Sequence, residues 1–236
     1  MDCHGTNRLT KFYRLSNSMN ERLHLHKEGL PIRTVIFDFG GVLLNLNPDK
    51  CRKAFHDLGI HQIEEFIDRY RPKGLFFEAE CGNIGQETFI SELQKLAPRP
   101  TTREEIITAY TSFLIELPPQ KLELIRRLHS GCEVFLLSNI NELCYNFCKE
   151  RFFAQQGYRM EDCFNRMYLS YQMRICKPDP GIYEAMLADS GLNPSTTLFV
   201  DDSRDNTEVA DRYGINTYLA LPEEDFRPLF EYLHLV

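Results

Sequence analysis

VIFDFGGVL, residues 35–43, is the stretch that decides the fold of this 236-residue chain. It lies within a short apolar run, RTVIFD at residues 33–38, whose β-branched residues are typical of a buried parallel strand. Asp38 ends that run, and Gly40 and Gly41 follow at once in a tight loop. A buried strand with an acid at its carboxyl end and a glycine loop behind it favours an α/β sheet with a polar site at its edge.

The second half of the chain alternates between short apolar runs and amphipathic segments. Strands are predicted at 133–137, 166–169, 197–200 and 215–219, and helices at 119–129, 141–154, 180–190 and 205–213. Alternating strands and helices of these lengths predict a Rossmann-like parallel sheet with helices on both faces.

Between the first strand and this alternating part, residues 48–116 change character. Helices are predicted there at 49–58, 61–71, 86–96 and 102–116, and no strand is expected. We therefore expect a core made of residues 31–47 and 117–236 and an inserted helical cap at 48–116. The first 30 residues are polar, with no apolar signal-peptide region, and are expected to be a disordered leader in which either Met1 or Met19 is the start.

The composition excludes several classes of function. The chain carries 27 basic and 34 acidic residues, a net charge of −7, which disfavours nucleic acid and anionic membranes as partners. No run approaches the roughly 18 apolar residues of a membrane span. We expect a cytoplasmic protein, monomeric or homodimeric.

Neither the cysteines nor the histidines of the leader are expected to bind a metal. The eight cysteines form no Cys-x-x-Cys pair, and reduced thiols are expected. His24 and His26 fall in the leader and are expected to be unstructured, without a metal role.

Three polar clusters follow predicted strands directly: Asp38, the pair Ser138-Asn139, and the pair Asp201-Asp202. In open parallel sheets, ligands bind outside the carboxyl ends of the strands, so these residues should converge on one crevice. A loop before the helix at 180–190 can bring in a lysine, Lys177.

The residue types in this crevice suit phosphoryl transfer. A carboxylate such as Asp38 can attack phosphorus and hold it as an aspartyl-phosphate. Asp38, a backbone carbonyl and Asp202 form a hard oxygen cage of the kind that Mg²⁺ prefers. Ser138 and Lys177 can bind the remaining phosphoryl oxygens, and the backbone around Gly41 can approach them closely. Asn139 completes the expected substrate-binding set.

Four stretches in order resemble the four motifs of the haloacid dehalogenase-like superfamily: VIFDFGGVL, LLSN at 136–139, CKPDPGIYE at 176–184 and LFVDDSRDN at 198–206. The resemblance covers residues 33–220, and the helical insertion is similar to the superfamily's C1-type cap. It implies a Mg²⁺-dependent hydrolase of a small phosphorylated metabolite.

The resemblance also implies a role for each matching residue. Asp38 is the implied nucleophile, and the Gly40 carbonyl and Asp202 the implied Mg²⁺ ligands. Ser138 and Lys177 are the implied phosphate ligands. Asp205 or Asn206 is expected beside the metal site, and residues 78–83 resemble the cap stretch that faces substrate.

One position departs from the usual phosphatase pattern. Gly40 stands where most phosphatases of this superfamily have an aspartate that acts as general acid and base, a group worth about 10²–10⁴-fold in rate. Three explanations stay open: a substrate with a good leaving group, as in the sugar-1-phosphatase-like members with an Asp-x-Gly motif; another acid, such as Asp201 or a cap residue; or a weak enzyme.

Structural interpretations compete with these roles. The Asp201-Asp202 and Ser138-Asn139 pairs could merely cap helices, and Lys177 could be a solvated surface lysine. A basic face of the cap (Arg69, Arg71, Lys73) is expected to be solvated. The rival functions are a metal-independent carbon–halogen hydrolase and a non-catalytic phosphate-binding or regulatory module.

Overall fold

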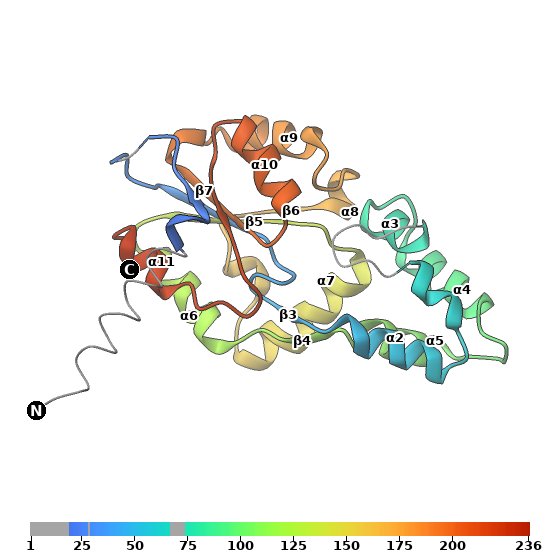
Figure 1. Ribbon diagram of the computed structural model, residues 1–236. Helices are drawn as coiled ribbons and strands as arrows, with labels where there is room; N and C mark the ends of the chain where they lie inside the picture. The colour runs from blue at the N-terminus through green and yellow to red at the C-terminus, as the bar shows by residue number, and fades with distance from the viewer. Residues whose placement is uncertain (1–18, 28, 67–73) are drawn as a thin grey trace, which may run out of the picture.

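The computed structural model of the protein describes residues 19–27, 29–66 and 74–236. A central sheet has the strand order β1-β8-β7-β2-β5-β6, and β3 and β4 form a separate ribbon (Figure 1). The strands are β1 (Leu23–His24), β2 (Thr34–Phe37), β3 (Asn45–Leu46), β4 (Leu114–Glu116), β5 (Glu133–Ser138), β6 (Arg166–Leu169), β7 (Thr197–Asp201) and β8 (Asn216–Leu219). Every pairing in the central sheet is parallel except that of β1 with β8.

Helices cover both faces of the sheet. Figure 1 shows α9 (Pro180–Ser190) and α10 (Arg204–Arg212) on one face, and α6 (Pro119–Leu128), α7 (Glu142–Cys148) and α11 (Arg227–Tyr232) on the other. The shorter helical pieces are η1 (His61–Glu65), η2 (Lys149–Phe153), η3 (Ala154–Gln156), η4 (Met160–Asp162), α8 (Ser170–Met173) and η5 (Pro194–Thr196). The predicted parallel α/β architecture is therefore confirmed.

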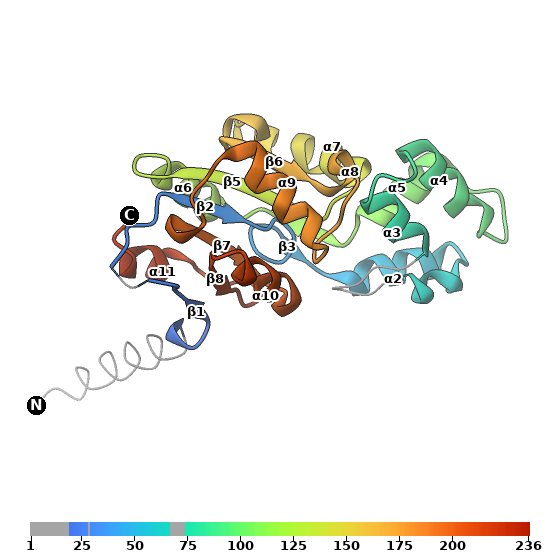
Figure 2. The ribbon, with the colours of Figure 1, turned by 90° about the horizontal axis from the view of Figure 1, so that it is seen from above.

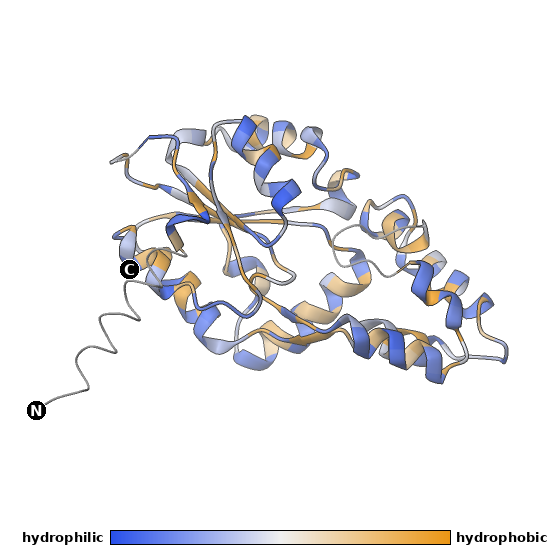
Figure 3. Ribbon diagram, viewed as in Figure 1, coloured by the Kyte–Doolittle hydropathy of each residue, from blue (hydrophilic) through white to orange (hydrophobic). Residues whose placement is uncertain are grey.

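Alternate residues of the central strands supply two separate cores. Val35 and Phe37 belong to the larger cluster, where the Phe37 ring packs on Phe230 of α11 with centroids 5.8 Å apart. Ile36 points the other way, into a cluster with Tyr183 of α9. Because both faces of β2 are buried, the strand is apolar throughout, which is why its sequence lacks the alternation of a half-exposed strand. Figure 3 shows this apolar centre.

Four helices form a unit at one end of the sheet: α2 (Pro48–Asp57), α3 (Gly74–Glu80), α4 (Gln86–Lys95) and α5 (Arg103–Thr111) (Figure 2). Their shared core contains Phe76, Phe89 and Tyr110, whose ring centroids lie 4.7–5.6 Å apart. The inserted helical cap is thus present, while its expected boundaries at residues 48 and 116 stay a prediction.

The expected helix at 102–116 is wrong in its last part. The helix starts as its capping box directs, with Thr102 and Glu105 bonded reciprocally. It ends at Thr111, because residues 114–116 pair with β3 as β4. The expectation of no strand within 48–116 is wrong for the same reason. The predicted helix at 61–71 is a 3₁₀ helix over 61–65, and residues 67–71 lie outside the described residues.

The expectation of a disordered leader is wrong for the segment around β1. Leu23 pairs with Tyr218 of β8, and Arg22 forms an ion pair with Glu224 at 2.7 Å. A two-residue strand leaves no periodic signal, so the sequence alone could not reveal it. Residues 1–18 lie outside the described part of the chain. Among the helices that are described, none combines the length and apolar character needed to cross a membrane.

The expectation that all cysteines are reduced is also wrong for one pair. Cys81, just after α3, forms a disulfide with Cys176 across a sequence separation of 95 residues. That separation hid the pair, because only the folded chain brings their Cα atoms to 5.5 Å. The other cysteines that the structure describes are free and buried: Cys51, Cys132, Cys144, Cys148 and Cys163.

Candidate active site

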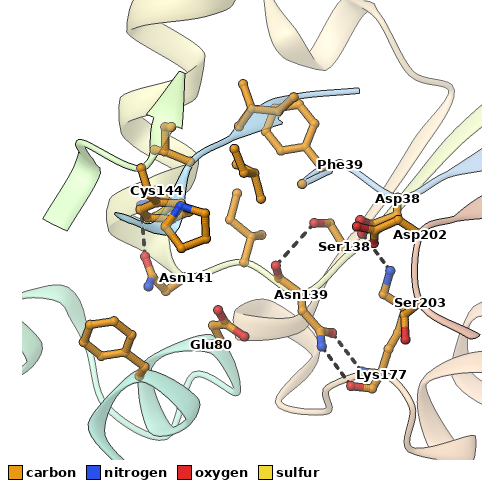
Figure 4. A pocket seen from close by; sticks show the side chains of 18 of the residues that line it. Asp38, Phe39, Glu80, Ser138, Asn139, Asn141, Cys144, Lys177, Asp202 and Ser203 are labelled. Carbon is orange, nitrogen blue, oxygen red and sulfur yellow. Dashed lines mark hydrogen bonds and ion pairs between the residues drawn. The ribbon is translucent and has the colours of Figure 1, made fainter. Parts of the chain in front are cut away.

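The carboxyl ends of three neighbouring strands bring the expected polar residues together. Asp38 follows β2, Ser138 ends β5 and Asp201 ends β7, and β2 lies between the other two strands. The backbone N–H of Asp38 donates to the carbonyl of Val200 at 2.9 Å, so the nucleophile candidate is still tied to the sheet. Figure 4 shows Asp38, Ser138, Lys177 and Asp202 gathered at this edge.

Lys177 is a buried cation at the centre of the cluster, and a solvated surface position is excluded. Its ammonium group donates to Asp38 Oδ1 at 2.7 Å, to Asp201 Oδ2 at 2.7 Å and to the Leu137 carbonyl at 2.8 Å. The Lys177 side chain is only 1% exposed. All three of its protons are therefore used, and the lysine fixes the orientation of Asp38.

Asn139 holds the backbone of Lys177 in place. Its amide nitrogen donates to the Lys177 carbonyl and its amide oxygen accepts from the Lys177 N–H, both at 2.8 Å. Asn139 also lines the cavity described below, and these two bonds fix the orientation of its amide group. Capping alone is excluded for Ser138-Asn139, because Asn141 caps α7.

The electrostatics of the cluster are dominated by burial and by an excess of acids. Burial raises the pKa of Asp38 to about 7; Lys177 opposes that change, and the charges of Asp201 and Asp202 add to it. Burial alone would lower the pKa of Lys177, but the carboxylates of Asp201 and Asp38 outweigh it and raise that pKa above its ordinary value. The lysine therefore stays charged between acids that lack enough positive charge around them.

The residues present fit a magnesium ion. Asp38, Gly40 and Asp202 line one cavity and offer carboxylate and carbonyl oxygens, the ligands that Mg²⁺ prefers. Among the described charged residues that line this cavity, three are acids and only Lys177 is a base. Gly41 has φ +83°, and a Cβ there would lie 2.3 Å from Asp202 Oδ2. Glycine thus lets the loop after Asp38 come against Asp202, and the two proposed carboxylate ligands share one site.

Asp201 has a different environment from its neighbour Asp202. Besides Lys177, it accepts hydrogen bonds from the Asn206 amide at 3.0 and 3.1 Å and from the Ser203 N–H at 2.8 Å. Asp201 is fully buried and does not line the cavity. It is therefore placed to hold Lys177, and it does not supply the acid that Gly40 lacks.

The cavity has a volume of about 170 Å³ and lies between the sheet edge and the helical cap. Asp38, Ser138, Lys177 and Asp202 form its polar end. Its other walls are mostly apolar and include Leu44, Leu46, Phe76, Tyr110, Phe113 and Leu114. The cavity can thus hold a charged group at one end and a carbon skeleton at the other.

Glu80, the last residue of α3, brings a third carboxyl group into the cavity, and this one comes from the cap. Burial raises its pKa to about 7; the charge of Asp38 adds to the rise and Lys177 opposes it. The Ser170 hydroxyl donates to the Glu80 carbonyl at 2.6 Å, and the Cys81–Cys176 disulfide follows directly. Glu80 falls in the stretch 78–83 that was expected to face substrate, although the sequence did not single it out.

Other expected residues are placed as follows. Asn206 lies next to the site and bonds Asp201, as a neighbour of the metal ligands should. Ser138 is 1% exposed and lines the cavity. Arg69, Arg71 and Lys73 lie outside the described residues.

Comparison with known proteins relates the chain to one family of hydrolases. Residues 32–214 match the model of the haloacid dehalogenase-like hydrolases. D-ribitol-5-phosphate phosphatase of Bacteroides thetaiotaomicron is 35% identical over 196 residues, which cover 83% of this chain and 95% of that protein. (S)-2-haloacid dehalogenase 4A of Burkholderia cepacia is 24% identical, over 84% of this chain and 89% of that protein.

Solved structures agree in fold. A HAD family enzyme of Bacteroides thetaiotaomicron, in complex with magnesium and inorganic phosphate, superposes with a TM-score of 0.79 at 35% identity. The match covers 84% of this chain and 99% of that one. A HAD-like family hydrolase from Porphyromonas gingivalis gives a TM-score of 0.80 at 35% identity, over 87% of this chain and 98% of that one.

Proposed function

The chain belongs to the haloacid dehalogenase-like hydrolases, and we propose that it is a magnesium-dependent phosphatase acting on a small phosphorylated sugar or sugar alcohol. The observation that carries this proposal is the geometry of Asp38. Its carboxylate is held at 2.7 Å by Lys177, shares a cavity with Asp202 and is followed by a glycine loop that packs closely against the Asp202 carboxylate. A relative that is 35% identical carries the name of a phosphatase of D-ribitol 5-phosphate.

The reaction has two steps on the residues of this chain. The Asp38 carboxylate forms a bond to phosphorus while the ester P–O bond breaks, which leaves an aspartyl-phosphate. Water then forms a bond to phosphorus while the P–O bond to Asp38 breaks, which frees phosphate and restores the carboxylate. Lys177 holds Asp38 in orientation, and the Ser138 hydroxyl donates to a phosphoryl oxygen.

Asp38, the Gly40 carbonyl and Asp202 would hold the magnesium ion. When bound, it neutralises charge on the phosphoryl oxygens, the main requirement of phosphoryl transfer. This requirement is acute here, because acids outnumber bases among the described residues that line the cavity.

Glu80 supplies the acid and base that Gly40 cannot. Of the carboxyl groups that line the cavity in the described part of the chain, it is the one that comes from the cap, across the cavity from the sheet edge (Figure 4). A group with a pKa of about 7 can give a proton to the leaving oxygen in the first step and take one from water in the second. Three explanations were open for the missing aspartate at position 40, and an acid from the cap is the one for which the structure offers a candidate residue.

The cavity walls also bear on the substrate. Hydroxyl groups of a sugar alcohol need polar partners, whereas Phe76, Phe113 and Leu114 can only pack against its carbon skeleton. Glu80 and the Tyr110 hydroxyl are the candidates to bond a substrate hydroxyl.

We propose that the chain acts in the cytoplasm, as a monomer or homodimer.

The proposal is tested by phosphate release from a panel of esters, with Mg²⁺ and with chelator. The panel contains D-ribitol 5-phosphate, sugar 1-phosphates, a nucleotide, p-nitrophenyl phosphate and an unbranched alkyl phosphate of similar length. We expect Mg²⁺-dependent release that is fastest with the sugar and sugar-alcohol phosphates. If the alkyl phosphate is fastest, the apolar walls decide the substrate and the polyol assignment is wrong.

The same panel separates the rival functions. Release of halide from a 2-haloacid in the presence of chelator would favour the carbon–halogen hydrolase. The absence of release from every ester, by protein that still binds Mg²⁺ and inorganic phosphate, would favour a non-catalytic binding module.

A further inference from the structure

Three residues with metal-binding side chains meet at the edge of the sheet, away from the catalytic cavity. They are His24 at the end of β1, His26 two residues later, and Asp211 in the last turn of α10. None of the three lines the cavity that holds Asp38. Their possible ligand atoms all lie within 4.8 Å of one another.

Two segments far apart in the sequence are held so that these side chains converge. His24 is opposite Thr217 in the antiparallel pairing of β1 with β8. The backbone N–H of His26 donates to Asn216 Oδ1 at 2.8 Å, which fixes the next bend of the chain. Backbone contacts therefore help to position both imidazoles beside α10, in addition to the contacts that the imidazoles themselves make with Asp211.

The two rings approach the same carboxylate oxygen from different directions. His24 contacts Asp211 Oδ1 through Nδ1, and His26 lies 3.1 Å from the same oxygen through Nε2. The ring planes are inclined by 60°, with centroids 5.0 Å apart. The possible ligand atoms are close enough together for one ion to bind two imidazole nitrogens and one carboxylate oxygen, and water would complete a tetrahedral site.

We propose that His24, His26 and Asp211 bind one zinc-type divalent ion. Imidazole nitrogen suits zinc and similar transition metals, whereas the oxygen-only set of Asp38, Gly40 and Asp202 suits magnesium, so the two sites select different ions. The ion would join β1 and the bend after it to α10. It would act as a clip that fastens the N-terminal segment to the edge of the sheet. The side chains are 59%, 29% and 34% exposed in the order given, so an ion can reach the site from solvent.

The test is a titration of the full chain with Zn²⁺ in excess Mg²⁺, which keeps the magnesium ligands occupied. Isothermal titration calorimetry should give one Zn²⁺ per chain, and Zn²⁺ should raise the melting temperature. His26→Ala and Asp211→Asn should each weaken binding by at least about tenfold, the scale on which even neighbours of metal ligands act. His234→Asn is the matched control, since it removes an exposed histidine elsewhere, and should bind like the wild type.

Co²⁺ gives a second readout, because its visible absorption reports tetrahedral nitrogen and oxygen ligands directly. The wild type should show this absorption and His26→Ala should lose it. No saturable Zn²⁺ binding by the wild type would overturn the proposal. Equal binding by the wild type and both variants would also overturn it, since the ion would then sit elsewhere.

Discussion

Gly41 and Asp202 are in such close approach that the two residues depend on each other: a Cβ on Gly41 would lie 2.3 Å from Asp202 Oδ2. The backbone of Gly41 has φ +83°, a conformation that other residues adopt only with strain. One glycine therefore lets the loop after Asp38 turn and leaves the Asp202 carboxylate its place.

Gly41→Ala should weaken Mg²⁺ binding and lower phosphatase activity by at least about tenfold. Either strain at positive φ or a displaced carboxylate costs about 1–3 kcal/mol, and 1.4 kcal/mol corresponds to a factor of ten. The activity should be measured as a function of Mg²⁺ concentration. Gly131→Ala is the control, because its Cβ would meet nothing within 4 Å. Unchanged Mg²⁺ dependence in Gly41→Ala would show that Asp202 does not bind the ion.

Lys177→Met should abolish activity and destabilise the fold by about 3–5 kcal/mol, because it leaves Asp38 and Asp201 buried without their shared cation. The loss should depend on pH. Without the ammonium, nothing opposes the rise that burial and the neighbouring carboxylates cause in the pKa of Asp38, so the variant becomes less stable as the pH rises from about 5 to 8. Urea unfolding at both pH values measures this.

Lys53→Met is the control for that substitution, since the Lys53 side chain is 75% exposed and pairs with Asp57 on the surface. It should change stability by less than about 1 kcal/mol at either pH. A Lys177→Met protein as stable as this control would contradict a buried ion cluster.

Glu80→Gln should lower the hydrolysis of alkyl and sugar phosphates by about 10²–10⁴-fold, the usual contribution of an acid and base catalyst. In the wild type the first step needs Asp38 ionised and Glu80 protonated, so kcat/KM should rise with pH as Asp38 loses its proton and fall again as Glu80, whose pKa is about 7, loses its own. The variant should lack that fall. It should also release p-nitrophenolate from p-nitrophenyl phosphate in a burst, because this leaving group departs without a proton while the second step, which lacks its base, is slow.

Glu78→Gln is the matched control on the same helix, where Glu78 bonds Asn83 at 2.9 Å. It should keep the wild-type pH profile. If Glu80→Gln hydrolyses an alkyl phosphate as fast as the wild type does, the acid lies elsewhere.

Most of the sheet and the core of the site could be predicted from the sequence, because both rest on local signals. The strand at 166–169 and the helix at 180–190 coincide with β6 and α9. Asp38 and Lys177 are bonded as neighbours although 139 residues separate them, because the carboxyl ends of parallel strands meet at one edge.

What the sequence could not provide are contacts between distant segments that carry no local pattern. The β1 strand forms because β8 offers it an edge, and the cysteines at 81 and 176 meet only once the cap has packed. Glu80 looks like any helix carboxylate until burial raises its pKa. The residue that we propose as the missing acid was therefore recognisable only in the folded chain.

The Cys81–Cys176 disulfide joins the residue after Glu80 to the residue before Lys177. Reduction should lower the free energy of unfolding by about 2–4 kcal/mol, since the bond closes a long loop in the unfolded chain. It should also raise KM, because the cap loop loses a tie to the catalytic edge. Urea unfolding and kinetics with and without reductant measure both effects. Cys81→Ser should have the stability and KM of the reduced wild type, and reductant should change neither. If reductant also leaves the stability and KM of the wild type unchanged, this link is contradicted.

The central claim is that Asp38 forms the bond to phosphorus. Its most direct test is phosphate release by Asp38→Asn in saturating Mg²⁺, beside Asp57→Asn, which alters an exposed acid of the cap whose side chain is 65% exposed. We predict that Asp38→Asn folds and releases no phosphate from any ester that the wild type hydrolyses, while Asp57→Asn retains full turnover. Turnover by a folded Asp38→Asn protein at the wild-type rate would contradict the account.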